Sequence, residues 1–275
     1  MSASKQDNWS SEAYQNSASF VPKLATKVMQ WLDPQPDDTI LDLGCGDGIL
    51  DLQIGHILSQ GSGSLHGIDA SPSMIETARK ATASANLQEK CTFAVLDATA
   101  LPSPPPRTYN KIFSNAALHW ILCPPSSRAP LFTSVRDALA PGGQFVFEMG
   151  GLGNVSEVRA AILSVLARRI GIAKAREADP WFFPDETWVK EIVQTVGGME
   201  VVRVEREWRP TDADKGGIEG WVRLMAKAFI EAVEDGKERE ECVREVVEVL
   251  EVVCGKPGWG WMFSYVRLRA VIKRL

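Results

Sequence analysis

The chain has 275 residues, enough for one large α/β domain or one domain with a sizeable insertion. Its formal net charge is −5 and it has no long basic block, which argues against a nucleic-acid partner because phosphate binding needs clustered lysine and arginine. Residues 1–16 lack the apolar core of a secretory signal, no stretch reaches the ~20 apolar residues that span a bilayer, and the cysteines and histidines show no zinc-binding spacing. We therefore expect a cytoplasmic protein with no membrane partner and no metal, while its oligomeric state is not evident.

Strand-like and helical segments alternate through the first half of the chain. Residues 39–43 form a short apolar run followed by glycines, which is typical of a buried parallel strand. The segment 71–85 begins with a serine and a proline, which are favoured at the cap and in the first turn of a helix. In chain order we expect a helix over 16–32, a strand over 39–43, a helix over 49–58, a strand over 64–68, a helix over 71–85, strands over 92–96 and 111–114, a helix over 127–139 and a strand over 144–148. Such alternation predicts a doubly wound, mostly parallel sheet.

The pattern changes after residue 150. We expect, in chain order, helices over 155–170 and 185–196, a strand over 200–208, helices over 217–233 and 237–253 and a strand over 261–271. We interpret this half as the last two strands of the sheet with helical insertions that form a lid over its edge. The chain would then comprise N-terminal cap helices (1–35), an α/β core (36–150) and a segment that completes the sheet and supplies the lid (151–275).

A glycine-rich turn, Leu41-Asp-Leu-Gly-Cys-Gly-Asp-Gly, lies between the first predicted strand and the helix that follows. Gly44, Gly46 and Gly48 let the chain turn sharply and let a ligand approach the backbone closely. Because the turn opens a helix, its backbone N–H groups face outward. On its own, such a turn suits a dinucleotide, a nucleoside or no ligand.

Two acids follow the next two strands. Asp69 lies at the end of the second strand and Asp97 at the end of the third, and ligands of open α/β sheets bind at these carboxyl ends. A carboxylate at position 69 can bind both hydroxyls of a ribose. The Asp97 carboxylate can accept a hydrogen bond from an adenine amino group, and the Ala98 N–H can donate one to a ring nitrogen. Together, the three strand ends predict a site for one adenosine.

The sequence motifs resemble a known family. DLGCGDG, GIDASPSMI, LDA and SNAALHW, with PGG before the fifth strand, are similar to the class I methyltransferases that use S-adenosylmethionine (SAM), and especially to the trans-aconitate methyltransferase branch. The motifs cover residues 9–150. The resemblance implies a Rossmann-like, seven-stranded, mostly parallel sheet whose final strand is antiparallel. It also implies transfer of the SAM methyl group to an acceptor. We favour a small-molecule acceptor, because the predicted lid would enclose it and no basic surface is evident, and we favour O-methylation of a carboxylate or hydroxyl over transfer to N or S.

By position, the resemblance also implies which residues hold SAM. The turn from Gly44 to Gly48 would hold the methionine part, Asp42 would support that turn or the amino group, and Met74 would cover one face of the adenine. Trp9 and Tyr14 would belong to an N-terminal cap that closes over the cofactor, although the same segment can equally be an amphipathic helix packed on the sheet. The full set of cofactor-binding residues is Trp9, Tyr14, Asp42, Gly44, Cys45, Gly46, Gly48, Asp69, Ala70, Met74, Asp97, Ala98, Asn115 and Ala116.

His119 is the candidate catalytic residue. It follows the fourth strand in Ser114-Asn-Ala-Ala-Leu-His-Trp, where it would lie near the sulfonium and the acceptor. Histidine can take a proton from an acceptor or donate a hydrogen bond to a substrate carboxylate. The alternative is that His119 only shapes the pocket or contacts SAM. A carboxylate acceptor needs no base.

The predicted lid is rich in aromatic residues that can line an apolar pocket for the acceptor, or simply hold the lid together. We propose His119, Trp120, Trp181 and Trp221 as acceptor-binding residues. Arg223 and Arg267 could bind an acidic acceptor, but exposed arginines are common and the sequence does not select either.

Two other functions compete with methyl transfer. An NAD-dependent oxidoreductase also has a glycine turn and an acid after the second strand, but the turn here is GCGDG rather than GxGxxG. A non-catalytic SAM-binding regulatory subunit would retain the same site, because methyl transfer needs no obligatory side chain. The sequence does not identify the acceptor or the atom that is methylated.

Overall fold

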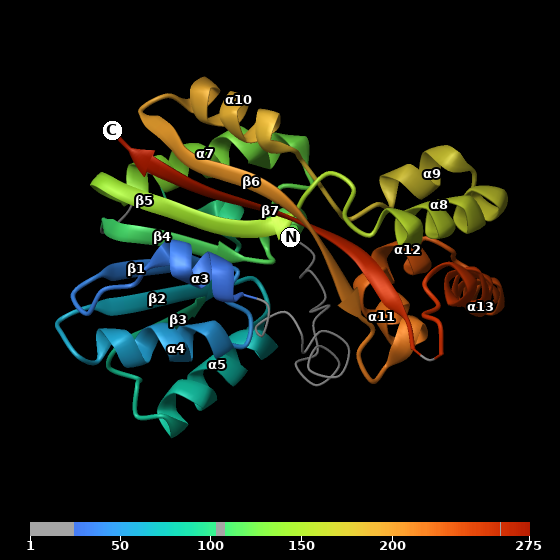
Figure 1. Cartoon of the computed structure of the whole chain (residues 1–275), viewed down its shortest axis with the longest axis horizontal. Helices are drawn as coiled ribbons and strands as arrows, with labels where there is room; N and C mark the ends of the chain where they lie inside the picture. The colour runs from blue at the N-terminus through green and yellow to red at the C-terminus, as the bar shows by residue number, and fades with distance from the viewer. Residues whose placement is uncertain (1–24, 103–107, 259) are drawn as a thin grey trace, which may run out of the picture.

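The computed structural model describes residues 25–102, 108–258 and 260–275 (Figure 1). Its centre is a seven-stranded sheet in the order β3-β2-β1-β4-β5-β7-β6. The strands are β1 (Thr39–Leu43), β2 (Ser64–Asp69), β3 (Cys91–Val95), β4 (Tyr109–Asn115), β5 (Leu139–Gly150), β6 (Met199–Asp212) and β7 (Met262–Arg274). β7 is antiparallel to both neighbours, β5 and β6, while the pairs among β1 to β5 are parallel. The predicted sheet, with its antiparallel final strand, is therefore confirmed.

Helices cover both faces of the sheet because side chains in each strand alternate between two apolar cores. Ile40 packs with α3, α4 and α5 on one face, whereas Leu41 and Leu43 pack with α7 and α10 on the other. The helices are α3 (Thr26–Leu32), α4 (Ile49–Leu58), α5 (Pro72–Ser84), α6 (Leu118–Ile121), α7 (Pro125–Ala138), α8 (Ser156–Ile170), α9 (Ile172–Glu177), α10 (Glu186–Val196), α11 (Gly217–Met225), α12 (Lys227–Glu231) and α13 (Gly236–Val253), and η1 (Ala98–Ala100) is a 3₁₀ turn.

Local signals in the sequence placed most of these elements well. Ser71 caps α5 by accepting a hydrogen bond from the Met74 N–H at 3.3 Å, with Pro72 in the first turn, as predicted. The described part of the helix expected over 16–32 is α3; the rest of that prediction lies outside the described residues. The helix expected over 217–233 is two helices, α11 and α12, and the short helices α6 and α9 were not expected.

Strands β5, β6 and β7 are longer than predicted. The Pro141-Gly-Gly segment, expected to precede the fifth strand, lies within β5, where the register to β4 shifts between Tyr109 and Lys111. β6 and β7 pair along their whole length, from Met199 with Arg274 to Asp212 with Met262. This long pairing carries both strands beyond the sheet toward a separate group of helices (Figure 1).

That group of helices, α8, α9, α11, α12 and α13, lies beside the extended ends of β6 and β7 (Figure 1). It has its own apolar core, which includes Trp181, Trp221 and Phe229 together with Phe263 and Tyr265 of β7. We call these five helices the lid. Phe263 and Tyr265 of β7 pack in the core of the lid, and the rest of β7 pairs within the sheet. One strand therefore connects the lid to the sheet.

Candidate functional site

A cavity opens at the carboxyl ends of β1 to β4 and extends to the lid. It is lined by Asp42, Gly44, Cys45, Gly46, Asp47, Ile49, Leu50, Asp69, Ala70, Met74, Leu96, Asp97, Ala98, Asn115, Ala116, Ala117, His119, Trp120, Ile121, Asn154, Val155, Trp181, Phe183, Trp221, Met225, Tyr265 and Arg267. Every predicted site residue in the described part of the chain except Gly48 belongs to this lining. Trp9 and Tyr14 lie outside the described residues.

The glycine turn has the conformation that its sequence requires. Gly44, Gly46 and Gly48 have φ angles of +76°, +58° and +76°, which favour glycine. A Cβ on Gly44 would lie 2.3 Å from the Ala117 Cβ, whereas one on Gly46 would have no neighbour within 4 Å. Gly44 is therefore needed for packing and Gly46 leaves space open beside the cavity.

Gly48, the third glycine of the turn, has a packing role that the sequence did not indicate. It does not line the cavity, and a Cβ on it would lie 2.8 Å from the Cβ of Ala78 in α5. Its lack of a side chain allows α4 to begin close against α5. The third glycine of the turn thus serves helix packing, while Gly44 and Gly46 border the cavity.

Asp69 joins two segments of the site. Its carboxylate accepts hydrogen bonds from the Gly46 N–H at 3.0 Å and from the Ser71 N–H at 2.9 Å, so it fixes the glycine turn against the start of α5. Asp97, at the end of the next strand, accepts from the N–H and hydroxyl of Thr99 at 3.0 and 2.8 Å. Both carboxylates line the cavity at neighbouring strand ends, as the sequence predicted.

Asp42 and Asp51 form a buried pair of acids beneath the turn. Asp42 is 3% exposed in β1 and Asp51 is fully buried in α4. Burial, and then the neighbouring Asp51, raises the pKa of Asp42 well above its usual range. Burial also raises the pKa of Asp51 to about 7. The burial of Asp51 was not expected from the sequence, because nothing in the local pattern distinguishes it from an acid on the surface of a helix.

Two buried oxygen atoms at the cavity wall are suited to a ligand that donates hydrogen bonds. Within the part of the chain that the structure describes, no donor group contacts the Oδ1 atoms of Asp42 and Asn115 or either carboxylate oxygen of Asp51, although Asp42 and Asp51 can bond to each other when one of them is protonated. Acceptors left unsatisfied in a protein interior are costly, so a ligand donor such as an ammonium group would complement them. With the open position at Gly46 and the two strand-end acids, this set of hydrogen-bond acceptors fits an amino acid joined to a nucleoside, as in SAM.

His119 lies in α6 at the centre of the cavity and is 7% exposed. Its Nδ1 accepts a hydrogen bond from the Gly150 N–H at 3.4 Å, which leaves the ring proton on Nε2. Burial, and then the positive charge of Arg267, lowers the pKa of His119 to about 3. A neutral histidine whose protonated form is so acidic is a weak base. These observations favour the donor role of His119 over the base role.

The lid side of the cavity is a wall of aromatic rings. Trp181 stacks on Phe183 with ring centroids 5.8 Å apart and meets Trp120 edge-on at 5.8 Å. Trp221 lies 6.1 Å from Trp181 and donates from Nε1 to the Tyr265 hydroxyl at 2.6 Å. Because these rings pack against one another and also line the cavity, they stabilise the lid and form part of the cavity surface.

Several lining residues were missed by the sequence analysis because they come from segments distant along the chain. Asn154 follows β5, and its Oδ1 accepts a hydrogen bond from the Val266 N–H at 2.9 Å. Phe183 and Tyr265 reach the same wall from the loop before α10 and from β7. No local motif indicates these positions. The structure also separates the two arginines, because Arg267 lines the cavity while Arg223 pairs with Glu219 and Glu240 on the surface.

The described residues contain neither a membrane-spanning helix nor a metal-binding cluster. No helix among them has the length and apolar character needed to cross a membrane. Within the same residues, no group of three or more His, Cys, Asp or Glu side chains could hold a metal ion.

Known proteins resemble the chain in sequence and in fold. A family model described as a methyltransferase domain matches residues 40–143. An uncharacterized methyltransferase of Schizosaccharomyces pombe is 38% identical over 272 residues, covering 97% of this chain and 98% of the relative. A SAM-dependent methyltransferase of Geobacter sulfurreducens, solved with S-adenosylhomocysteine, has a TM-score of 0.54 at 16% identity and covers 92% of this chain and 91% of its own.

A third similar protein has a small-molecule ligand. It is a phosphoethanolamine N-methyltransferase of Haemonchus contortus, solved with phosphomonomethylethanolamine and S-adenosylhomocysteine, with a TM-score of 0.53 at 16% identity. The match covers 92% of this chain and 52% of that protein. The relative matched along nearly its full length establishes the family, and the chain belongs to the class I SAM-dependent methyltransferases.

Proposed function

We propose that this enzyme transfers the methyl group of SAM to an oxygen atom, a carboxylate or a hydroxyl, of a small molecule bound beneath the lid. The observation that carries the proposal is one cavity that runs from the glycine turn and the strand-end acids to the aromatic wall of the lid. Such a cavity has room for the cofactor at one end and an enclosed acceptor at the other. The aromatic wall favours an acceptor with apolar surface.

In this proposal the cofactor end is held by the residues that the sequence indicated. Asp69 binds the ribose hydroxyls, Asp97 and Ala98 bind the adenine edge, and Met74 packs on its face. The unsatisfied oxygens of Asp42 and Asn115 receive the amino group. The remaining contacts come from Gly44, Cys45, Gly46, Ala70 and Ala116, all of which line the cavity, with Trp9 and Tyr14 closing over it from the N-terminal segment.

When bound, SAM supplies a methyl group that its sulfonium has already activated. The chain has to hold the acceptor in line with that group and exclude water, and orientation alone can contribute ~7–11 kcal/mol. We propose that the Nε2–H of His119 donates a hydrogen bond to the acceptor and that His119 does not remove a proton from it, because its Nδ1 is engaged by the Gly150 N–H. A carboxylate acceptor, which needs no base, is consistent with this arrangement.

The comparisons support a small acceptor without identifying it. The Haemonchus contortus protein binds phosphomonomethylethanolamine, a small molecule, within a similar fold. We further propose that the chain is related to the trans-aconitate methyltransferase branch, on the basis of the motif resemblance between residues 9 and 150. Small carboxylic acids and secondary metabolites are therefore the first acceptors to test.

The proposal is tested by incubating the full-length protein with methyl-labelled SAM and a panel of carboxylic acids, alcohols, amines and thiols, followed by mass spectrometry of the products. We expect a methyl ester or methyl ether from at least one panel member and none from protein or RNA substrates. Tight SAM binding without transfer to any acceptor would instead indicate a non-catalytic subunit. Products methylated only on RNA or protein would overturn the choice of acceptor class.

A further inference from the structure

Arg267 is buried in the wall of the cavity near the lid. It is 3% exposed, lies in β7 opposite Gly150 and Glu207, and is the one positively charged side chain among the described lining residues. Its Nε is buried and has no hydrogen-bond partner in the described part of the chain. A buried guanidinium whose charge is not matched by a hydrogen-bonded partner is expected to be complemented by an anion that enters the cavity.

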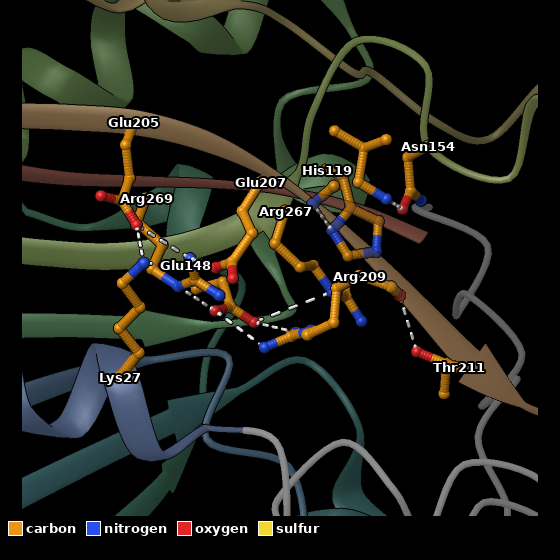
Figure 2. Close-up of polar contacts among 12 residues, drawn as sticks. Lys27, His119, Glu148, Asn154, Glu205, Glu207, Arg209, Thr211, Arg267 and Arg269 are labelled. Carbon is orange, nitrogen blue, oxygen red and sulfur yellow. Dashed lines mark hydrogen bonds and ion pairs between the residues drawn. The ribbon is translucent and has the colours of Figure 1, made fainter. Parts of the chain in front are cut away.

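The nearest carboxylate, Glu148, is already occupied. Arg269 donates from Nε to one Glu148 oxygen at 2.5 Å, and Arg209 donates to the other at 2.7 Å. Arg267 approaches the same carboxylate only to 3.7 Å, which is beyond a hydrogen bond (Figure 2). Glu148 therefore lies close enough to offset part of the charge on Arg267 but does not use its donors.

The acids on the other side of this cluster do not supply the missing partner. Glu205 and Glu207 bind Arg269 at 3.2 and 2.5 Å, and both also pair with Lys27 of α3 (Figure 2). The connected group contains the cations Lys27, Arg203, Arg209, Arg267 and Arg269 and the anions Glu148, Glu205 and Glu207. Its cations outnumber its anions by two, and the cation that lines the cavity is Arg267.

A second donor lies beside Arg267. Gly150, which pairs with Arg267 in the β5–β7 ladder, holds His119 through its N–H, so both side chains are positioned from the same point of β5. The guanidinium also lies 4.7 Å from the ring of Tyr265, which limits its movement. The neutral His119 ring directs its Nε2 proton away from that backbone contact. Two donors with fixed positions thus serve the acceptor end of the cavity.

We infer that Arg267 and His119 form an anion-binding subsite that holds an acidic group, a carboxylate or a phosphate, of the methyl acceptor. The inference rests on the proposed function and adds a substrate class to it. The acidic lining residues Asp42, Asp47, Asp69 and Asp97 lie at the cofactor end, whereas Arg267 lies at the lid end. The negative charges at the cofactor end suit the cationic cofactor, and the positive charge at the lid end suits an anionic acceptor.

Binding of small acids to the complex of the full-length protein with S-adenosylhomocysteine tests the subsite by calorimetry. The probes are benzoate, phenyl phosphate, succinate and trans-aconitate, and benzamide and succinamide are the uncharged controls. We expect at least one acid to bind about tenfold or more tightly than its uncharged counterpart. Comparison of benzoate with phenyl phosphate distinguishes a carboxylate subsite from a phosphate subsite.

Substitution of Arg267 connects this binding to the residue. Arg267→Gln should weaken binding of the acid by about 30-fold or more, the loss usual for one partner of a buried charge pair. Arg267→Lys keeps the charge without the two-pronged donor and should give a smaller loss. Arg223→Gln, which removes a surface arginine engaged with Glu219 and Glu240, should leave acid binding unchanged.

Two results would overturn the subsite: equal binding of acids and uncharged controls, or unchanged acid binding in an Arg267→Gln protein that still binds S-adenosylhomocysteine. Retained affinity for S-adenosylhomocysteine shows that the variant is folded. A methylation assay separates this inference from the proposed function. Equal methylation of an acidic acceptor by wild type and Arg267→Gln would overturn the subsite alone, whereas Arg267-dependent acid binding without transfer to any acceptor would support the subsite and count against the proposed function.

Discussion

The two ends of the cavity are built in different ways. At the cofactor end, consecutive strand–turn–helix units contribute backbone N–H groups, glycines and acids, each within a few residues of its strand. At the lid end, rings and charges come from α6, from the loop before α10, from α11 and from β7, which are distant in sequence. The first end is a property of local segments, and the second exists only because long-range packing brings those segments together.

This contrast predicts that damage to one end leaves the other largely intact. The largest expected effect is on stability at the lid end. Trp181 is 5% exposed and packs against Trp120, Phe183 and Trp221, so Trp181→Ala should lower the free energy of unfolding by about 3–5 kcal/mol. Denaturant unfolding measures the loss.

The matched control for Trp181→Ala is Trp208→Ala, which removes a tryptophan that is 61% exposed and should change stability by no more than about 0.5 kcal/mol. Affinity for S-adenosylhomocysteine, measured where both proteins are folded, should change little in either variant. If Trp181→Ala abolished cofactor affinity while remaining folded, the two ends could not be treated as separate.

The reverse pattern is expected at the cofactor end. Asp69→Ala removes a carboxylate that fixes the glycine turn and that we propose binds the ribose, so affinity for SAM should fall roughly 100-fold, the value of two charge-assisted hydrogen bonds. Calorimetry with SAM measures this. Glu89→Ala, which removes an exposed acid in the loop before β3, should bind SAM as wild type does. Normal SAM binding by Asp69→Ala would refute the placement of the ribose.

The buried acids should make stability depend on pH. Because burial raises the pKa of Asp51 from 3.8 to about 7, the folded state binds a proton that the unfolded state has lost between those values. The free energy of unfolding should therefore fall as the pH rises from about 4 to 7, by up to ~1.4 kcal/mol per pH unit for one proton. Asp51→Asn should reduce this fall, as measured by denaturant unfolding over that range. Parallel pH curves for the two proteins would show that Asp51 titrates normally.

The smallest effect is expected on kcat when His119 is substituted. If the Nε2–H of His119 donates a hydrogen bond to the acceptor, His119→Gln should reduce kcat by less than about tenfold, because glutamine retains a hydrogen-bond donor. His119→Ala, which has no donor, should reduce kcat further. Loss of a general base would instead cost ~10²–10⁴-fold in both variants. Once an acceptor is known, kcat measured between pH 5 and 9 should show no ionisation of His119, whose pKa is about 3. An ionisation near pH 6.5 that disappears in His119→Gln would restore the base role.

The sequence by itself determined the sheet core and the cofactor end of the cavity. The short strands 39–43 and 64–69, the cap at Ser71 and the glycine turn are specified by patterns that span fewer than about 20 residues. The positions of Asp69, Asp97 and Asn115 at the cavity could be predicted because parallel strands end at one edge of a sheet. The position of a polar residue along its strand therefore also gives its position in space.

Only the tertiary structure decided the surroundings of Gly48, Asp51, His119 and Arg267. The packing of α4 on α5 gives Gly48 its role, and the same burial places Asp51 against Asp42. The Gly150 N–H selects the ring nitrogen of His119 that carries the proton, and Arg209 and Arg269 occupy Glu148, so that Arg267 stays 3.7 Å from that carboxylate. These properties depend on desolvation and on partners as many as 121 positions away, which no local pattern encodes.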